Sequence, residues 1–194
     1  PTKNLGAFGD AGMVVTNDLG LAQKLRILRN HGMEPQYYHR YIGGNFRLDA
    51  LQAVVLLKKL LHLDAWSRRR WEIAQTYREA LADLSPDLSL PSEPYRETCG
   101  PAGHIFHQFV IRTKYRDELR MNLREAGIGT EIYYPLALHQ QDCFRHLGYR
   151  GGEFPEAESA AQECLALPIF PELTNEEIQL VTEAIQTFFE KRHV

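Results

Sequence analysis

The stretch from Leu48 to Leu84 contains neither proline nor glycine, the two residues that most often end helices, and it therefore predicts a long helical segment. Residues 51–61 are apolar nearly all round, so we expect them to be covered on more than one side. The rest keeps one apolar stripe, formed by Trp71, Ala74, Tyr77, Leu81 and Leu84. A helix that changes from all-round burial to one buried face is expected to pass between two bodies.

Before this segment the pattern predicts one strand and one helix. Residues 11–16 (AGMVVT) are a β-rich run between turn-formers, and residues 18–31 repeat leucines at helical spacing behind the capping residue Asp18. Residues 33–46 have no period and predict an ordered loop of the kind that often carries sites. One strand with one helix is too little for a sheet domain, so we interpret this part as the tail of a larger domain whose beginning is absent.

After the segment, strand and helix patterns alternate. Residues 104–113 and 128–134 alternate like strands, with a helical pattern at 115–126 between them. A further helical pattern starts near Pro155, and the last one begins with a capping box of Thr174 and Glu177. This order indicates an α/β or α+β chain.

Composition excludes several classes of partner. The chain of 194 residues has 44% hydrophobic and 24% charged residues and a formal net charge of −3, so no global field attracts nucleic acid or an anionic membrane. The most apolar stretch is interrupted by Gln52, Lys58 and Lys59, and we expect no membrane span. The three cysteines are far apart, which favours a reduced, cytoplasmic protein over a disulfide framework or a zinc site.

The opening segment PTKNLGAFGDAG raises a question about Lys3. Glycines follow this lysine at intervals of three, which fits neither common phosphate-binding glycine pattern. One interpretation is a surface lysine beside a glycine-rich turn. The other is an amine that forms an imine with an aldehyde cofactor, with the backbone in close approach. The segment by itself leaves both open.

Six motifs along the whole chain resolve the ambiguity through a resemblance. In order, the chain resembles the DegT/DnrJ/EryC1/StrS family of sugar aminotransferases in KNLGAFGDAGMVVTND, LRNHG, YIGGNFRLDALQAVVL, HIFHQFVIRT, GIGTEIYYPLALHQQ and FPEAESAAQECLALPIFPEL with TNEEIQLVTEAI. The resemblance implies the α/β fold of fold type I transferases that depend on pyridoxal 5'-phosphate (PLP). It further implies that residues 1–62 are the tail of the large PLP-binding domain, and that residues 63–194 are an interdomain helix with the small C-terminal domain.

The resemblance also assigns roles to two residues of the first part. Lys3 matches the lysine that binds PLP covalently, and it serves as the catalytic residue. Asn45 matches the asparagine that reaches the cofactor phosphate of the neighbouring subunit in a homodimer, a role that an amide N–H suits. The family's N-terminal half, which supplies the remaining cofactor contacts, is expected to be missing from this chain.

The activity that the resemblance implies is amino transfer through PLP and its amine form, from glutamate to a nucleotide-linked keto-sugar used in polysaccharide or antibiotic sugar biosynthesis. The family also contains a dehydratase with histidine at the lysine position, so Lys3 favours transamination. The alternative is a catalytically silent C-terminal module, inactive as the isolated chain. A third hypothesis is a metal hydrolase that uses the scattered histidines.

The histidine spacing argues against the metal-hydrolase hypothesis. His104 and His107 on an alternating strand face opposite sides, which is poor zinc geometry, and we predict no metal site. By resemblance His107 lies near the sugar-nucleotide pocket and is a candidate substrate contact. Tyr133 is a second candidate, although many relatives have histidine there and core packing is an equal alternative. The sugar, its nucleotide and the aminated carbon are not specified by the sequence.

Overall fold

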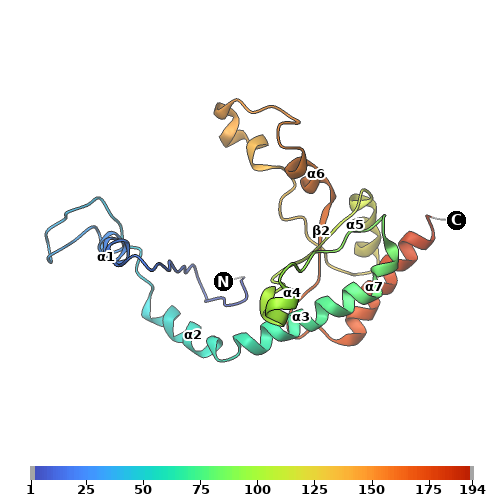
Figure 1. Ribbon diagram of the computed structural model, residues 1–194, viewed down its shortest axis with the longest axis horizontal. Coiled ribbons are helices and arrows are strands. Elements are labelled where there is room, and N and C mark those ends of the chain that lie inside the picture. Colours follow the sequence, from blue (N-terminus) through green and yellow to red (C-terminus); the bar gives the residue numbers. More distant parts are fainter. Residues whose placement is uncertain (1–2, 193–194) are drawn as a thin grey trace. The chain divides into compact units, whose positions relative to one another are not determined.

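The computed structural model describes residues 3–192, which form two compact units that meet in the sequence at Asp64 and Ala65. The chain is a mixture of helices and strands, which confirms the predicted α/β class (Figure 1). No helix in residues 3–192 is long and apolar enough to cross a membrane.

Unit 1 contains the helices α1 (Leu19–Leu28) and α2 (Ala50–Leu60). The Asp18 side chain caps α1 as predicted, because its Oδ1 accepts a hydrogen bond from Leu21 N at 3.0 Å. The strand predicted at residues 11–16 is not formed, and Met13, Val14 and Val15 are exposed. A strand needs a neighbour to pair its N–H and C=O groups, and residues 3–64 offer none beyond isolated bridges.

The helical segment predicted from Leu48 to Leu84 is divided near its middle. Leu61 N and His62 N both bond back to Lys59 O, a tight turn that ends α2 before α3 (Leu63–Ala80) begins. The predicted all-round burial of residues 51–61 does not occur within the described chain: α2 has no buried residue, and Leu51 is 84% exposed. The apolar face of α2 is therefore open to a further partner surface.

Unit 2 contains the remaining elements around one core. α3 carries the predicted apolar stripe, with Ala74, Tyr77 and Leu81 fully buried and Trp71 and Leu84 packed against them. The elements after α3 are η1 (Ala82–Leu84), α4 (Arg96–Cys99), η2 (Gly100–Gly103), β1 (Phe109–Arg112), α5 (Arg116–Glu125), η3 (Leu138–Gln140), η4 (Asp142–Leu147), α6 (Pro155–Glu163), β2 (Cys164–Leu167) and α7 (Asn175–Glu190).

The sheet of unit 2 is the antiparallel pair β1–β2, in which Phe109 lies opposite Leu167 and Ile111 opposite Leu165. These four side chains are buried in the core, so the alternation of the strands turns Val110 and Ala166 to the opposite face. The strand predicted at 104–113 is shorter because Phe106 has a positive φ of 42°, which interrupts extended backbone.

Two other segments differ from the strand predictions. The predicted strand at 128–134 makes only a bridge from Glu131 to Ala166. β2 itself was not predicted, because its residues continue a helical pattern from α6.

α7 completes the core and begins with the predicted capping box. Thr174 Oγ1 accepts from Glu177 N, and the Glu177 side chain accepts from Thr174 N. α7 lies beside α3 in Figure 1, and Gln186 Nε2 donates to Ala80 O at 2.7 Å. Tyr77 of α3 also donates its hydroxyl proton to Pro168 O, just after β2, at 2.9 Å, and burial raises the pKa of Tyr77.

A pair of side chains holds the segment between η3 and α6. His139 Nε2 lies 3.0 Å from Glu158 Oε1, and both side chains are largely buried. The same carboxylate accepts from Gly152 N at 2.8 Å, while the His139 ring packs 4.7 Å from the ring of Phe154. The hydrogen bond from Gly152 N, followed by that from His139, holds the pKa of Glu158 below its usual range.

We expect Tyr77→Phe to lower the free energy of unfolding by about 1 kcal/mol at neutral pH, because Pro168 O loses its buried donor. The raised pKa keeps Tyr77 neutral in the folded state, whereas in the unfolded chain this tyrosine ionises near pH 10.0. The contribution of Tyr77 to the free energy of unfolding is therefore intact below pH 10.0 and is lost as pH rises further. Denaturant titration should show the gap between variant and wild type narrowing above pH 10.0. Tyr95→Phe, at a 63% exposed position, is the control, and an equal effect there would contradict the assignment.

We expect Glu158→Ala to release the segment that carries Arg145 and Arg150, since the variant loses the acceptor for Gly152 N and His139. Trypsin should then cleave after these two arginines faster than in the wild type. The control is Glu156→Ala, at an exposed position, which should leave the cleavage rate unchanged.

Because the pKa of Glu158 is lowered in the folded state, the stabilisation that this carboxylate gives to the fold is complete above the ordinary pKa of 4.5. This stabilisation is lost as pH falls through the folded-state pKa. The protection of the Gly152 amide hydrogen, measured against its intrinsic exchange rate at each pH, should fall only below that value. Equal cleavage of wild type and Glu158→Ala would rule out this role.

Candidate functional site

The loop that follows Lys3 is held by two side chains of α2. Lys3 is exposed in a bend, and a few residues later Phe8 N donates to Gln52 Oε1 at 2.8 Å. Lys59 Nζ donates to Gly6 O, and Ala7 between these contacts is buried. Gln52 and Lys59 are seven residues apart and so lie on one side of α2. The helix therefore fixes the backbone just after Lys3 by polar contacts.

Asn45 lies on a segment bonded to the end of α1. His31 N donates to Gly44 O at 2.9 Å, and Phe46 N donates to Arg29 O at 2.9 Å. The approach is close enough that a Cβ on Gly43 would lie 2.4 Å from Leu28 O, so only glycine fits there. The backbone of Asn45 is consequently held in one place by its two neighbours.

The Asn45 side chain is held by an arginine. Its Oδ1 accepts from Arg47 Nε at 3.0 Å, and Arg47 Nη1 donates to Asn30 Oδ1 at 2.9 Å. Asn30 and Asn45 also face each other in an antiparallel bridge. Within residues 3–192 the Asn45 Nδ2 group makes no hydrogen bond. The amide thus presents two unused N–H donors, next to an arginine cation.

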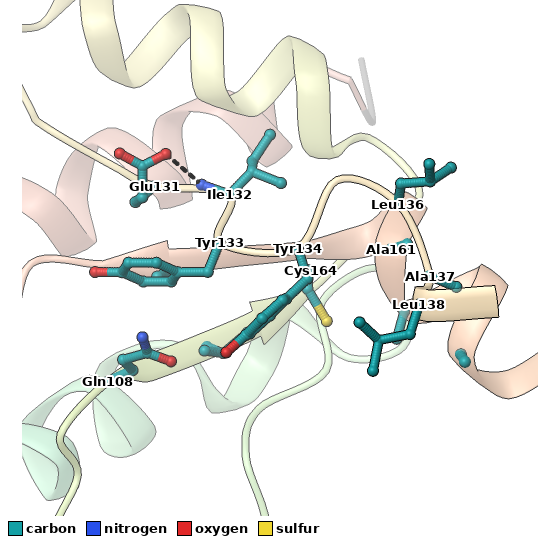
Figure 2. A pocket seen from close by; sticks show the side chains of 14 residues that line it. Gln108, Glu131, Ile132, Tyr133, Tyr134, Leu136, Ala137, Leu138, Ala161 and Cys164 are labelled. Carbon is teal, nitrogen blue, oxygen red and sulfur yellow. Dashed lines mark hydrogen bonds between the residues drawn. The ribbon is translucent and has the colours of Figure 1, made fainter. Parts of the chain in front are cut away.

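Unit 2 contains a mostly apolar cavity of about 530 Å³ on the outer face of the sheet. Figure 2 shows Tyr133 and Tyr134 in one part of it and Leu136, Ala137 and Leu138 in another. Cys164 also lines the cavity, and burial raises the pKa of its thiol, so this sulfur stays protonated at neutral pH. The cavity suits the uncharged body of a ligand rather than an ion.

The two candidate substrate contacts, His107 and Tyr133, line one smaller hollow of about 320 Å³ together with Gln108 and Thr130. Tyr133 is half exposed and also borders the larger cavity. His104 and His107 precede β1 rather than lying on it, and His104 Nδ1 accepts from Phe106 N at 2.9 Å. The structure therefore brings His107 and Tyr133 together, in a setting different from the predicted strand.

The four predicted site residues divide between the units, with Lys3 and Asn45 in unit 1 and His107 and Tyr133 in unit 2. Sequence reasoning missed Arg47, which holds the Asn45 side chain, and Gln52 and Lys59, which hold the loop after Lys3. Arg47 had a detectable signal, because residues two apart in extended backbone point to the same side and Arg47 follows Asn45 at that spacing. Gln52 and Lys59 contact residues far away in the sequence and gave no local signal.

Known proteins resemble the chain along nearly its whole length. It is 50% identical over 189 residues to the "Pleiotropic regulatory protein" of Geobacillus stearothermophilus, covering 97% of this chain and 50% of that protein. It is 45% identical over 188 residues to a UDP-N-acetyl-3-dehydro-alpha-D-glucosamine 3-aminotransferase of Acidithiobacillus ferrooxidans, covering 96% of this chain and 48% of that protein. The chain therefore spans about half the length of these relatives.

A solved structure confirms the predicted fold. Streptomyces venezuelae DesV, crystallised with a ketimine intermediate, is 41% identical with a TM-score of 0.88, covering 96% of this chain and 49% of that one. The chain has the fold of this part of a fold type I transferase. Its residues 1–186 also match the DegT/DnrJ/EryC1/StrS aminotransferase family as a whole. On sequence and structure together, the chain belongs to the DegT/DnrJ/EryC1/StrS aminotransferase family.

Proposed function

We propose that the complete protein is a PLP-dependent aminotransferase that transfers an amino group, with glutamate as donor, to a nucleotide-linked keto-sugar. The proposal rests on similarity to two proteins, each covering 96% of this chain. One is a relative named for 3-amination of a UDP-linked sugar, and the other is DesV. The name of the Geobacillus relative describes regulation rather than a reaction. Lys3 supports the transaminase reading because a reactive amine is the group that this chemistry requires.

The residues present fit the cofactor. Lys3 offers an exposed amine for covalent attachment, and Asn45 Nδ2 offers unused N–H donors of the kind that a phosphate oxygen accepts. When bound, PLP supplies an electron sink for the carbanion formed when the amine-bearing carbon loses its proton. Gln52 and Lys59 fix the loop after Lys3, so its backbone is ordered before any ligand binds.

Two further steps belong to side chains of this chain. The Lys3 amine is suited to remove the proton from the amine-bearing carbon of the donor. In the second half of the transfer it can deliver a proton to the carbon that receives the amino group. His107 and Tyr133 are proposed to contact the sugar nucleotide, since both line the hollow of about 320 Å³. An imidazole and a phenol at one hollow provide the donors and acceptors that a sugar hydroxyl or a diphosphate needs.

A homodimer in the cytoplasm is the proposed setting. The apolar face of α2, with Leu51, Val54 and Leu57 exposed, supports a protein interface beside Asn45, as cross-subunit contact by that residue requires. Cys99, Cys143 and Cys164 are free thiols, which suits a reducing compartment.

A second candidate is a folded module that does not catalyse transamination by itself. Unit 2 has its own core, whereas the only hydrophobic side chains buried among the described residues of unit 1 are those of Ala7 and Ile27. This candidate predicts that the 194-residue chain expressed alone binds no PLP tightly, while the complete protein does.

Lys3→Ala in the complete protein is expected to abolish the visible absorbance of lysine-bound PLP without unfolding the protein, because Lys3 is exposed and supports no core contact. Borohydride reduction followed by peptide mass spectrometry should place the cofactor on Lys3 in the wild type. Lys58→Ala, at an exposed position on α2, is the control. Reduction that fixes the cofactor to another lysine would show that Lys3 is wrongly assigned.

Asn45→Ala is expected to weaken PLP binding by about 1.5–3 kcal/mol, the contribution of one hydrogen bond to a charged group. The dimer should persist, as measured by sedimentation. Pyridoxal, which lacks the phosphate, should bind the variant and the wild type alike. If PLP affinity does not change, Asn45 is only a turn residue.

A further inference from the structure

We propose that Arg47 is a positioning residue that orients the Asn45 amide with its N–H donors toward the cofactor phosphate. This inference rests on the proposed function, in which Asn45 contacts that phosphate. Arg47 does not itself need to touch the cofactor in this arrangement. Its role follows from the bonds that it makes to Asn45 and Asn30 in unit 1.

The physical problem is that an asparagine side chain has two ends of opposite character. Its Oδ1 accepts hydrogen bonds and its Nδ2 donates them, while the two ends have nearly the same shape. A phosphate has only acceptor oxygens at its negative charge, so it is attracted by Nδ2 and repelled by Oδ1. An exposed asparagine that rotates freely would present the wrong end for part of the time.

Arg47 removes this ambiguity. Its Nε donates to Asn45 Oδ1 at 3.0 Å, and its backbone N lies 3.5 Å from the same oxygen. An arginine has only donors, so it pairs with Oδ1 and cannot pair with Nδ2. The bond therefore directs Nδ2 away from the guanidinium, which agrees with the absence of any hydrogen bond from Nδ2 within residues 3–192.

The guanidinium is itself anchored at a second point. Arg47 Nη1 donates to Asn30 Oδ1 at 2.9 Å, and Asn30 follows α1 directly after its C-cap residue, Arg29. The backbone bridge between Asn30 and Asn45 sets the two asparagines opposite each other, and one guanidinium bonds to the side chains of both. A lysine ammonium is a single point of charge and does not reproduce this two-point geometry.

The experiment measures dissociation constants of PLP and pyridoxal for variants of the complete protein. We expect Arg47→Met to weaken PLP binding about tenfold, roughly the effect of losing one hydrogen bond to a charged group. Arg47→Lys should weaken it nearly as much although the charge remains, and Asn30→Ala should weaken it less, about threefold, because one anchor survives. Pyridoxal affinity should stay unchanged in all three. Arg40→Met removes an exposed arginine of the same unit that pairs with Glu34, and it should have no effect.

A double variant separates positioning from direct attraction. If Arg47 acts through Asn45, then Arg47→Met added to Asn45→Ala weakens PLP binding no further, because the group that it orients is already gone. Full additivity of the two effects would overturn the inference and assign Arg47 a direct electrostatic contact with the phosphate. Wild-type affinity in Arg47→Met would also overturn it. Circular dichroism and thermal unfolding identify a variant that fails to fold, and Asn30→Ala then provides the decisive comparison.

The outcomes distinguish this inference from the function on which it rests. If Asn45→Ala weakens PLP binding but Arg47→Met and Asn30→Ala do not, the proposed function stands and the positioning role is wrong. If Asn45→Ala has no effect on PLP binding, the assignment of Asn45 fails and the role of Arg47 fails with it.

Discussion

The burial of the apolar stripe of α3 is the constraint on which unit 2 depends. Ala74, Tyr77 and Leu81 are fully buried, and the Tyr77 ring lies 5.1 Å from the ring of Phe109 on β1. A two-stranded sheet is only marginally stable alone, so β1 and β2 depend on this packing for their position. The Tyr77 hydroxyl also holds Pro168 O, immediately after β2. The hollow that contains His107 and Tyr133 is bordered by that same segment, so its shape follows from the core.

Unit 1 is organised by a different kind of interaction. Its candidate site loops are held by hydrogen bonds from Gln52, Lys59 and Arg47, while the apolar face of α2 is exposed. Each exposed polar contact contributes little free energy, but together such contacts fix the direction of groups that burial would leave unspecified. Packing determines where an element lies. Polar contacts here determine which atom of a side chain is presented.

The helices were predictable because their signals are local. Apolar spacing and the caps at Asp18 and Thr174 gave α1, α3, α5 and α7 from short stretches of sequence. Strands depend on partners far away, so the pattern at residues 11–16 predicted a strand that finds no partner, and β2 was missed. Lys3 and Asn45 are predicted site residues that rest on family resemblance, whereas no resemblance pointed to Arg47, Gln52 and Lys59. Their roles depend on contacts across the fold that no local pattern contains.

Under the proposed function, the candidate residues of unit 1 and those of unit 2 have different tasks. If Asn45 binds the cofactor phosphate as proposed, it must present one donor in one direction, and the bonds from Arg47 to two amide oxygens suit that task. Contacts to a sugar nucleotide instead need a surface whose size and polarity vary with the substrate. His107 and Tyr133 lie on irregular backbone that borders cavities, where a changed side chain alters the cavity without disturbing the core. In the proposed enzyme, side chains held by fixed hydrogen bonds would bind the cofactor, and loops on a packed core would allow the substrate contacts to vary.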